Sequence, residues 1–115
     1  MSTNKDIINK VNEAFIQNDT EIFLTYCHEN IVWTLVGTSV WKGKEEIRDA
    51  LKVHDEQPPV FTINQTIAEN NIVVSNGTME MHLPGGKLFK GEFCDIYRFD
   101  NGKISEMRSY VVETK

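Results

Sequence analysis

The side chains best suited to chemistry lie in the C-terminal part of the chain, around Asp95. Side chains alternate between the two faces of a strand, so in the run FCDIYRF the residues Phe93, Asp95 and Tyr97 share one face. That face is aromatic except for the one carboxylate, and burial among rings raises the pKa of such a group. We predict that Asp95 acts as an acid or hydrogen-bond donor; the alternative is pairing with Arg108, Lys90 or a backbone amide.

Two further titratable side chains, Glu80 and His82, belong to the preceding strand. If Gly85 and Gly86 are the two turn residues, the pairing places both side chains on the Asp95 face. A slip of one residue would turn them outward. An imidazole titrates near neutral pH, so His82 or Glu80 is the predicted catalytic base. The alternative is a polar lining role, with His82 hydrogen-bonded to a neighbour.

The segments that position these residues are predicted to be helices first and strands afterwards. Thr3 with Asp6, and then Asp19, are the expected N-caps of two helices, the first reaching about Gln17 and the second burying Cys27. Further elements follow: a strand over Ile31–Val36, a loop over Gly37–Gly43, a helix over Lys44–Val53, and strands over Val60–Glu69, Ile72–Leu83, Leu88–Phe99 and Lys103–Val112, with a bend or bulge near Asn76-Gly77.

This order is the α+β pattern. A strongly curved antiparallel sheet wrapped over three N-terminal helices forms a cone with an open mouth, and pockets commonly lie in such a mouth. The chain has no repeats and no linker, so we expect one domain over residues 1–115.

The sequence around Asp100-Asn101-Gly102 is compatible with two turn lengths for the last hairpin, and the turn length decides which residues share the Asp95 face. A two-residue turn puts Arg108 and Tyr110 on the Asp95 face. A three-residue loop with a glycine bulge puts three other residues there instead: Met107, Ser109 and Val111.

The predicted register leaves an apolar face on the other side of these strands. Its members are Met79, Met81, Leu83, Leu88, Cys94 and Ile96. Such a face is too apolar to stay in water as one patch. If the helices cover the aromatic face, a homodimer through this second face is expected.

Composition excludes several classes of partner. A net charge of −5 argues against nucleic acid and anionic membrane surfaces, and no run approaches the length of a membrane span. Cys27 and Cys94 lie far apart without a CxxC pattern, which favours reduced thiols in a cytoplasmic protein. The His and acidic residues at 28–29 and 54–56 lack the spacing of converging ligands, so neither a metal nor a cofactor is expected.

Two stretches carry a resemblance to a known family. CDIYRFDNGKISEMRSY resembles the closing hairpin of the SnoaL-like and ketosteroid-isomerase-like branch of the nuclear transport factor 2-like superfamily. YCHENIVWTLVG followed by GKEEI is similar to the opening of SnoaL-like sequences. The resemblance implies a cystatin-like cone around an apolar pocket, a small apolar ligand and a homodimer.

The steroid isomerases of this superfamily keep one aspartic acid protonated in an apolar site. By resemblance that acid falls on Asp95, whereas the base position falls at Thr34 and the helical tyrosine at or next to Val11, neither of which can serve. We therefore predict a SnoaL-like protein that binds a small molecule in an apolar pocket; if it is an enzyme, we expect isomerisation or cyclisation by proton transfer, not standard steroid isomerisation. The alternative is a non-catalytic ligand-binding or dimeric association module.

The resemblance also favours the second arrangement of the last hairpin. The residues that we predict to contact the ligand are Trp33, Thr34, Phe93, Tyr97, Met107, Ser109 and Val111. For Trp33 and Tyr97 the alternative is a place in the core.

Overall fold

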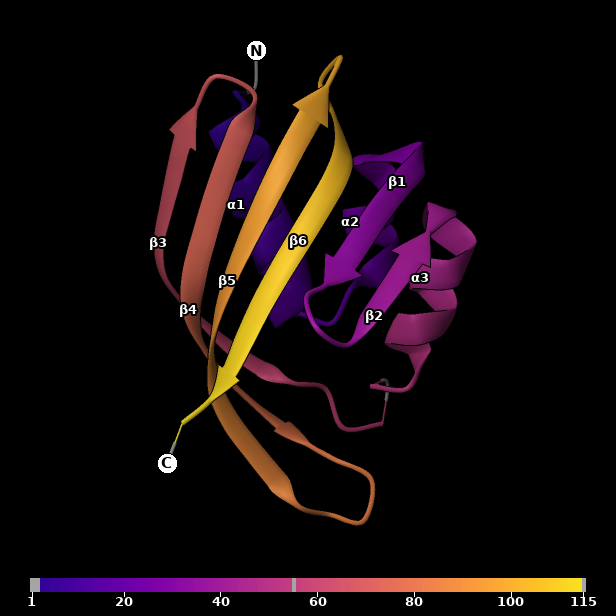
Figure 1. The fold of residues 1–115 in the computed structure, drawn as a ribbon, viewed down its shortest axis with the longest axis vertical. Helices are drawn as coiled ribbons and strands as arrows, with labels where there is room; N and C mark the ends of the chain where they lie inside the picture. Colours follow the sequence, from indigo (N-terminus) through magenta and orange to yellow (C-terminus); the bar gives the residue numbers. More distant parts are fainter. Residues whose placement is uncertain (1–2, 55, 115) are drawn as a thin grey trace.

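The computed structural model describes residues 3–54 and 56–114, which form three helices and a six-stranded sheet (Figure 1). The helices are α1 (Asn4–Ile16), α2 (Thr20–Thr25) and α3 (Gly43–Lys52). The strands are β1 (Cys27–Leu35), β2 (Ser39–Lys42), β3 (Val60–Glu69), β4 (Ile72–His82), β5 (Leu88–Asp100) and β6 (Lys103–Glu113).

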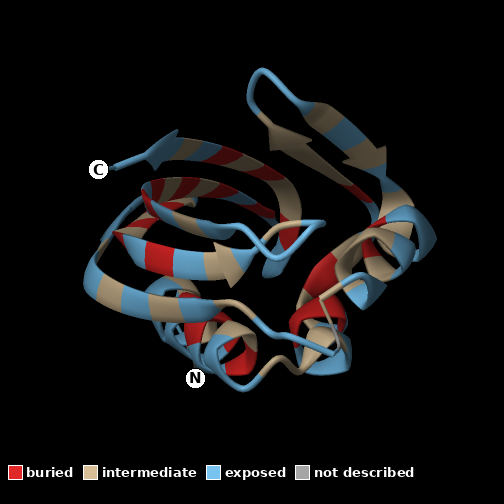
Figure 2. Ribbon diagram, turned by 90° about the horizontal axis from the view of Figure 1, so that it is seen from below, coloured by how far each residue is buried: buried red, intermediate tan, exposed pale blue. Residues whose placement is uncertain are grey.

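The strands form one curved, unclosed sheet in the order β2-β1-β6-β5-β4-β3. Neighbouring strands are antiparallel except β1 and β6, which run parallel. The helices lie on the concave side of the sheet, and buried residues alternate with exposed ones along the strands (Figure 2). This arrangement confirms the predicted α+β cone.

The first two helices begin where the sequence predicts. The Thr3 side chain accepts from the Asp6 backbone N–H at 3.1 Å, and the Asp6 carboxylate accepts from the Thr3 N–H at 3.1 Å. Asp19 caps α2 by accepting from the Ile22 N–H at 3.2 Å. These bonds satisfy N–H groups that have no partner within the helix.

Two predictions around β1 are wrong. The second helix ends at Thr25, because Cys27 already pairs with Ile104 of β6. The segment 37–43 was expected to be a loop but contains β2. Trp41 of β2 lies opposite Trp33 of β1, with ring centroids 5.4 Å apart. Such cross-strand aromatic pairs stabilise a short edge strand whose own sequence signal is weak.

The sheet bends where β3 and β4 meet at Gly77. β3 carries one extra residue, Asn64, so that Ile63 pairs with Gly77 and Gln65 with Asn76. A Cβ atom on residue 77 would lie 1.9 Å from the Thr62 carbonyl oxygen, so only glycine allows this approach. The bulge thus lies on the strand opposite the predicted Asn76-Gly77 irregularity.

The predicted register of the β4–β5 hairpin is wrong by one residue. The loop has three residues rather than two, because the Leu83 N–H donates to the Lys87 carbonyl at 2.8 Å. His82 consequently pairs with Leu88, and Glu80 with Lys90. Both titratable side chains therefore lie on the convex face, away from the helices.

The same shift moves Met79 and Met81 onto the concave face, where they pair with Gly91 and Phe89. Met79 and Met81 are therefore wrong members of the predicted apolar face, whereas Leu88, Cys94 and Ile96 do lie on the convex face. The convex face of β4 and β5 is instead a mixture of aliphatic and charged side chains: Ile72, Val74, Thr78, Glu80, Lys90, Glu92, Cys94, Ile96 and Arg98.

The β5–β6 hairpin combines features of both expected arrangements. Asn101 and Gly102 form a two-residue turn with φ of 51° and 78°. β6 then carries an extra residue, Ser105, which shifts the register. Asp95 consequently pairs with Ser109, and the neighbouring pairs place Met107 and Val111 on the same face.

The core lies between the helices and the part of the concave face next to the β5–β6 turn. Its fully buried side chains include Ile8, Val11, Phe23, Ile31, Ile47, Tyr97 and Ile104. Within the described ranges, none of the helices has the length and apolar character needed to cross a membrane.

Candidate functional site

A cavity of about 340 Å³ lies between the concave face of the sheet and the helices. This volume is within the range of small-molecule sites. Its wall is largely aromatic and aliphatic, with contributions from α1, α3 and all six strands: Phe15, Trp33, Trp41, Leu51, Phe61, Met79, Phe93 and Met107.

Asp95 is the buried acidic group of this wall. It lies on β5 between Ser75 of β4 and Ser109 of β6, and 9% of it is exposed. Burial raises the pKa of Asp95 to about 7, although a hydrogen bond from Ser109 acts in the opposite direction. Both protonation states are therefore populated near neutral pH, as an acid–base group requires.

Ser109 connects Asp95 to the aromatic wall. The Trp33 Nε1–H group donates to the Ser109 Oγ atom at 2.9 Å. The Trp33 ring is held in turn by Trp41 and by Phe23, whose ring centroid lies 5.9 Å away. The orientation of Ser109 is thus fixed by a packed tryptophan.

On the other side of Asp95, Asn12 of α1 forms a second polar contact. Its Nδ2 atom lies 3.1 Å from the Ser75 Oγ and 3.5 Å from the Thr66 Oγ1. Asn12 and Ser75 are both buried and were missed by the sequence analysis. A signal was present for Asn12, because it occupies a position in the apolar stripe of α1, four residues after Ile8.

The structure brings six of the predicted site residues to the cavity wall: Trp33, Phe93, Asp95, Met107, Ser109 and Val111. Tyr97, farther along β5, is fully buried in the core, and its hydroxyl has no hydrogen-bond partner among the described residues. Thr34 pairs with Arg108 on the convex face, so it does not line the cavity.

The structure does not bring Glu80 and His82 to Asp95. Both are exposed, and the Glu80 Oε1 atom lies 3.7 Å from the Lys90 Nζ atom on the convex face. The physical reason is the three-residue hairpin loop, which reverses the faces of β4 relative to β5. The predicted three-group acid–base cluster therefore does not form.

In the part of the chain that the structure describes, two other titratable side chains line the cavity, His54 and Asp19. His54 follows α3, where its N–H donates to the Leu51 carbonyl at 3.2 Å, and Asp19 is already engaged as the α2 cap. Over residues 3–54 and 56–114, no three His, Cys, Asp or Glu side chains gather as a metal site would require. Asp55, in the acidic segment considered for metal binding, lies outside the described residues.

The fold and this arrangement define a cone with one buried carboxyl in an apolar cavity. Residues 8–107 match the SnoaL-like domain family, and the chain belongs to that family. A search of curated proteins gives no match.

Solved structures of similar fold extend over nearly the whole chain. An NTF2-like protein of unknown function from Cytophaga hutchinsonii is 25% identical, with a TM-score of 0.79, and the match covers 96% of this chain and 100% of that one. An NTF2-like protein from Burkholderia thailandensis is 19% identical, with a TM-score of 0.88 and coverages of 97% and 92%. A putative polyketide cyclase from Xanthomonas campestris pv. campestris is 16% identical, with a TM-score of 0.80 and coverages of 94% and 92%. The chain thus has the NTF2-like fold.

Proposed function

We propose that this protein binds a compact, largely apolar ring compound that carries a carbonyl or enol oxygen. Neutral Asp95 donates a hydrogen bond to that oxygen and, in an enzymatic role, supplies the proton that stabilises the enolate. The observation that carries this proposal is a buried carboxyl lining an apolar cavity. The cytoplasmic location belongs to the same proposal, supported by the free thiols of Cys27 and Cys94.

The shape and chemistry of the cavity support a ring compound. The wall offers ring faces from Phe15, Phe61, Trp33 and Trp41, which favour flat ligands. A volume of about 340 Å³ accommodates a compact ligand rather than a long chain.

The reaction class is an isomerisation or cyclisation by proton transfer, as the polyketide cyclase label of one structural relative suggests. A standard steroid isomerase mechanism has no support, because Thr34 lies on the convex face and Val11 has no hydroxyl. Of the described residues, His54 is the remaining wall group whose side chain could accept a proton as the base.

Tryptophan fluorescence tests the binding proposal directly, because both tryptophans of the chain line the cavity. Titration with cyclic ketones and phenols is expected to quench this emission. Each oxygen-bearing compound should bind roughly tenfold more tightly than its deoxygenated counterpart, the value of about one hydrogen bond. Asp95→Ala should remove that preference. Absence of binding by every compound in the panel would contradict the proposal.

Proton transfer is tested separately by NMR in D₂O with the ketones that bind. The wild-type protein should exchange their α-protons faster than the Asp95→Asn variant does, because the amide cannot shuttle a proton. Binding without this exchange would instead support the second candidate function, a non-catalytic binding module. The observation that favours the module is the placement of Glu80 and His82 outside the cavity.

A further inference from the structure

Trp33, Ser109 and Asp95 form a hydrogen-bond chain whose direction is set by chemistry. An indole N–H group can only donate, so the Ser109 Oγ atom accepts from Trp33, at 2.9 Å. A serine hydroxyl carries a single hydrogen, which this contact leaves free. The hydroxyl of Ser109 therefore donates to Asp95, its partner across β5 and β6.

The neighbours of Asp95 limit what its second carboxyl oxygen can contact. Ser75, the partner on β4, is engaged with Asn12, with Nδ2 and Oγ atoms 3.1 Å apart. Asp95 itself lines the cavity. With Ser109 and Ser75 accounted for on the neighbouring strands, the cavity is the remaining surface that Asp95 lines.

We propose that Trp33 and Ser109 are positioning residues that fix the orientation of the Asp95 carboxyl. Ser109 holds one oxygen of the carboxyl as an acceptor, and Trp33 holds the Ser109 hydroxyl in the donating direction. The proton of neutral Asp95 then resides on the other oxygen, which faces the cavity and a ligand. This inference rests on the proposed function, because it says how the carboxyl is presented to the bound compound.

The carboxyl needs a fixed hydrogen-bond donor to hold its orientation, because the χ2 torsion of an aspartate has a broad and roughly twofold distribution. Without a fixed donor, the protonated oxygen would exchange between the cavity and the strand interface. The wall of the cavity offers no charged group on β5 or β6 that would hold it. Among the described residues, Tyr97 and Cys94 are the titratable neighbours of Asp95 on β5, and Asp19 at the start of α2 and His54 after α3 line the same cavity.

The test is a ¹³C NMR titration of the Asp95 carboxyl in four variants. Ser109→Ala removes the donor to the carboxylate, so the midpoint should rise by roughly one pH unit. Ser109→Thr retains the hydroxyl and should restore the wild-type midpoint. Trp33→Phe should raise the midpoint by a smaller amount, because the Ser109 hydroxyl loses its fixed direction. Trp41→Phe keeps the Trp33 N–H donor and leaves an aromatic ring against Trp33, so it should shift the midpoint less than Trp33→Phe does.

Equal midpoints in wild type, Ser109→Ala and Trp33→Phe would overturn the inference, as would a Trp41→Phe shift equal to that of Trp33→Phe. If Ser109→Ala fails to fold, as judged by circular dichroism, the comparison of the two tryptophan variants decides alone. Fluorescence titration of the same proteins separates the two proposals. Midpoint shifts without ligand binding would contradict only the proposed function, whereas binding with unshifted midpoints would contradict only the positioning role.

Discussion

Asp95 is the only buried carboxylate among the residues that the structure describes, and its burial costs free energy unless it is neutral. The usual pKa of 3.8 rises to about 7 because burial disfavours the charge. Between these two pH values the folded protein keeps a proton that the unfolded chain has lost. The free energy of unfolding therefore falls as the pH rises from about 4 to about 7, and is constant with respect to this group above that range.

Asp95→Asn should abolish this pH dependence, because the amide stays neutral. Relative to wild type, the variant should gain up to about 4 kcal/mol of stability between pH 4 and pH 8, measured by urea unfolding at each pH. Glu92→Gln, on the exposed face of β5, is the matched control and should follow the wild-type profile. If the free energy of unfolding changed with pH in the same way in Asp95→Asn and in wild type, the Asp95 pKa would not be raised.

At the scale of elements, β3 and β4 approach each other closely at Gly77, beside the bulge in β3. Gly77→Ala places a Cβ atom against the Thr62 carbonyl, which is main chain and cannot rotate away. We expect a loss of about 3 kcal/mol or more in the free energy of unfolding by urea. Thr78→Ala, at the next and exposed position, should cost less than about 1 kcal/mol. If both variants lost the same free energy of unfolding, residue 77 would not lie close to the Thr62 carbonyl.

The predictable elements are those specified by residues close together in sequence. The capping box of Thr3 with Asp6 and the alternating runs from Val60 onward gave helix and strand bounds to within a few residues. β2 could not be predicted, because its stability comes from Trp33, eight residues before Trp41 and on another strand.

Of the candidate site, too, the sequence predicts the part that depends on residues close together in the chain. Asp95 and Phe93 share a face through simple alternation, so their place in the cavity wall needed no pairing partner. Glu80 and His82 depended on the length of one loop, and three residues instead of two moved them to the convex face. Tyr97 has the alternation of a wall residue, but it lies farther along β5, towards the β5–β6 turn, where it is buried in the core.

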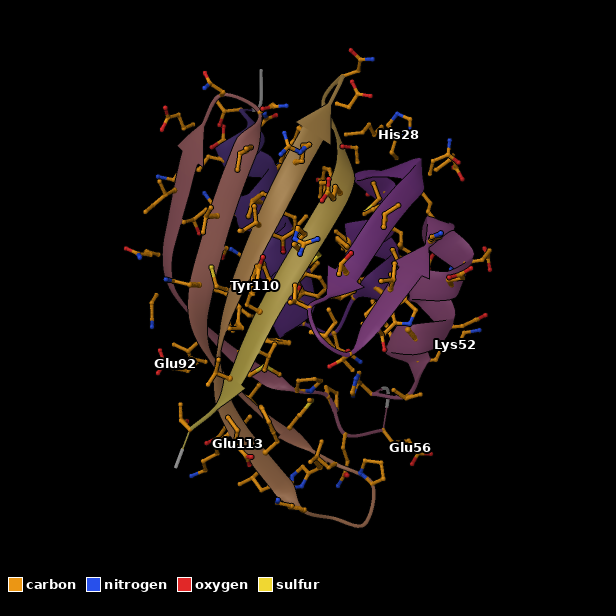
Figure 3. All side chains as sticks on the ribbon, in the orientation of Figure 1. His28, Lys52, Glu56, Glu92, Tyr110 and Glu113 are labelled. Atoms are coloured by element: carbon orange, nitrogen blue, oxygen red, sulfur yellow. The ribbon has the colours of Figure 1, made fainter. Side chains whose placement is uncertain are left out.

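At the scale of the whole molecule, the sheet has two faces with different surroundings. The concave face is covered by helices, whereas the convex face exposes aliphatic and aromatic side chains. Tyr110 lies on this convex face, away from the helices (Figure 3). Ile67, Val74 and Ile96 form a row across β3, β4 and β5 beside it. The apolar surface is thus present, although its members are not the methionines first expected.

We expect two copies of the chain to cover this row by associating through their convex faces, which removes apolar surface from water. Light scattering after size exclusion should give twice the 13.2 kDa of one chain. Ile67→Glu should shift the protein to the single-chain mass, because Ile67 is 55% exposed on that face and a symmetric contact would bring the new charge into an apolar interface. Ile16→Glu, 46% exposed on α1, is the matched control and should leave the mass unchanged. A wild-type mass of one chain at about 100 μM, well above a micromolar dissociation constant, would contradict the dimer.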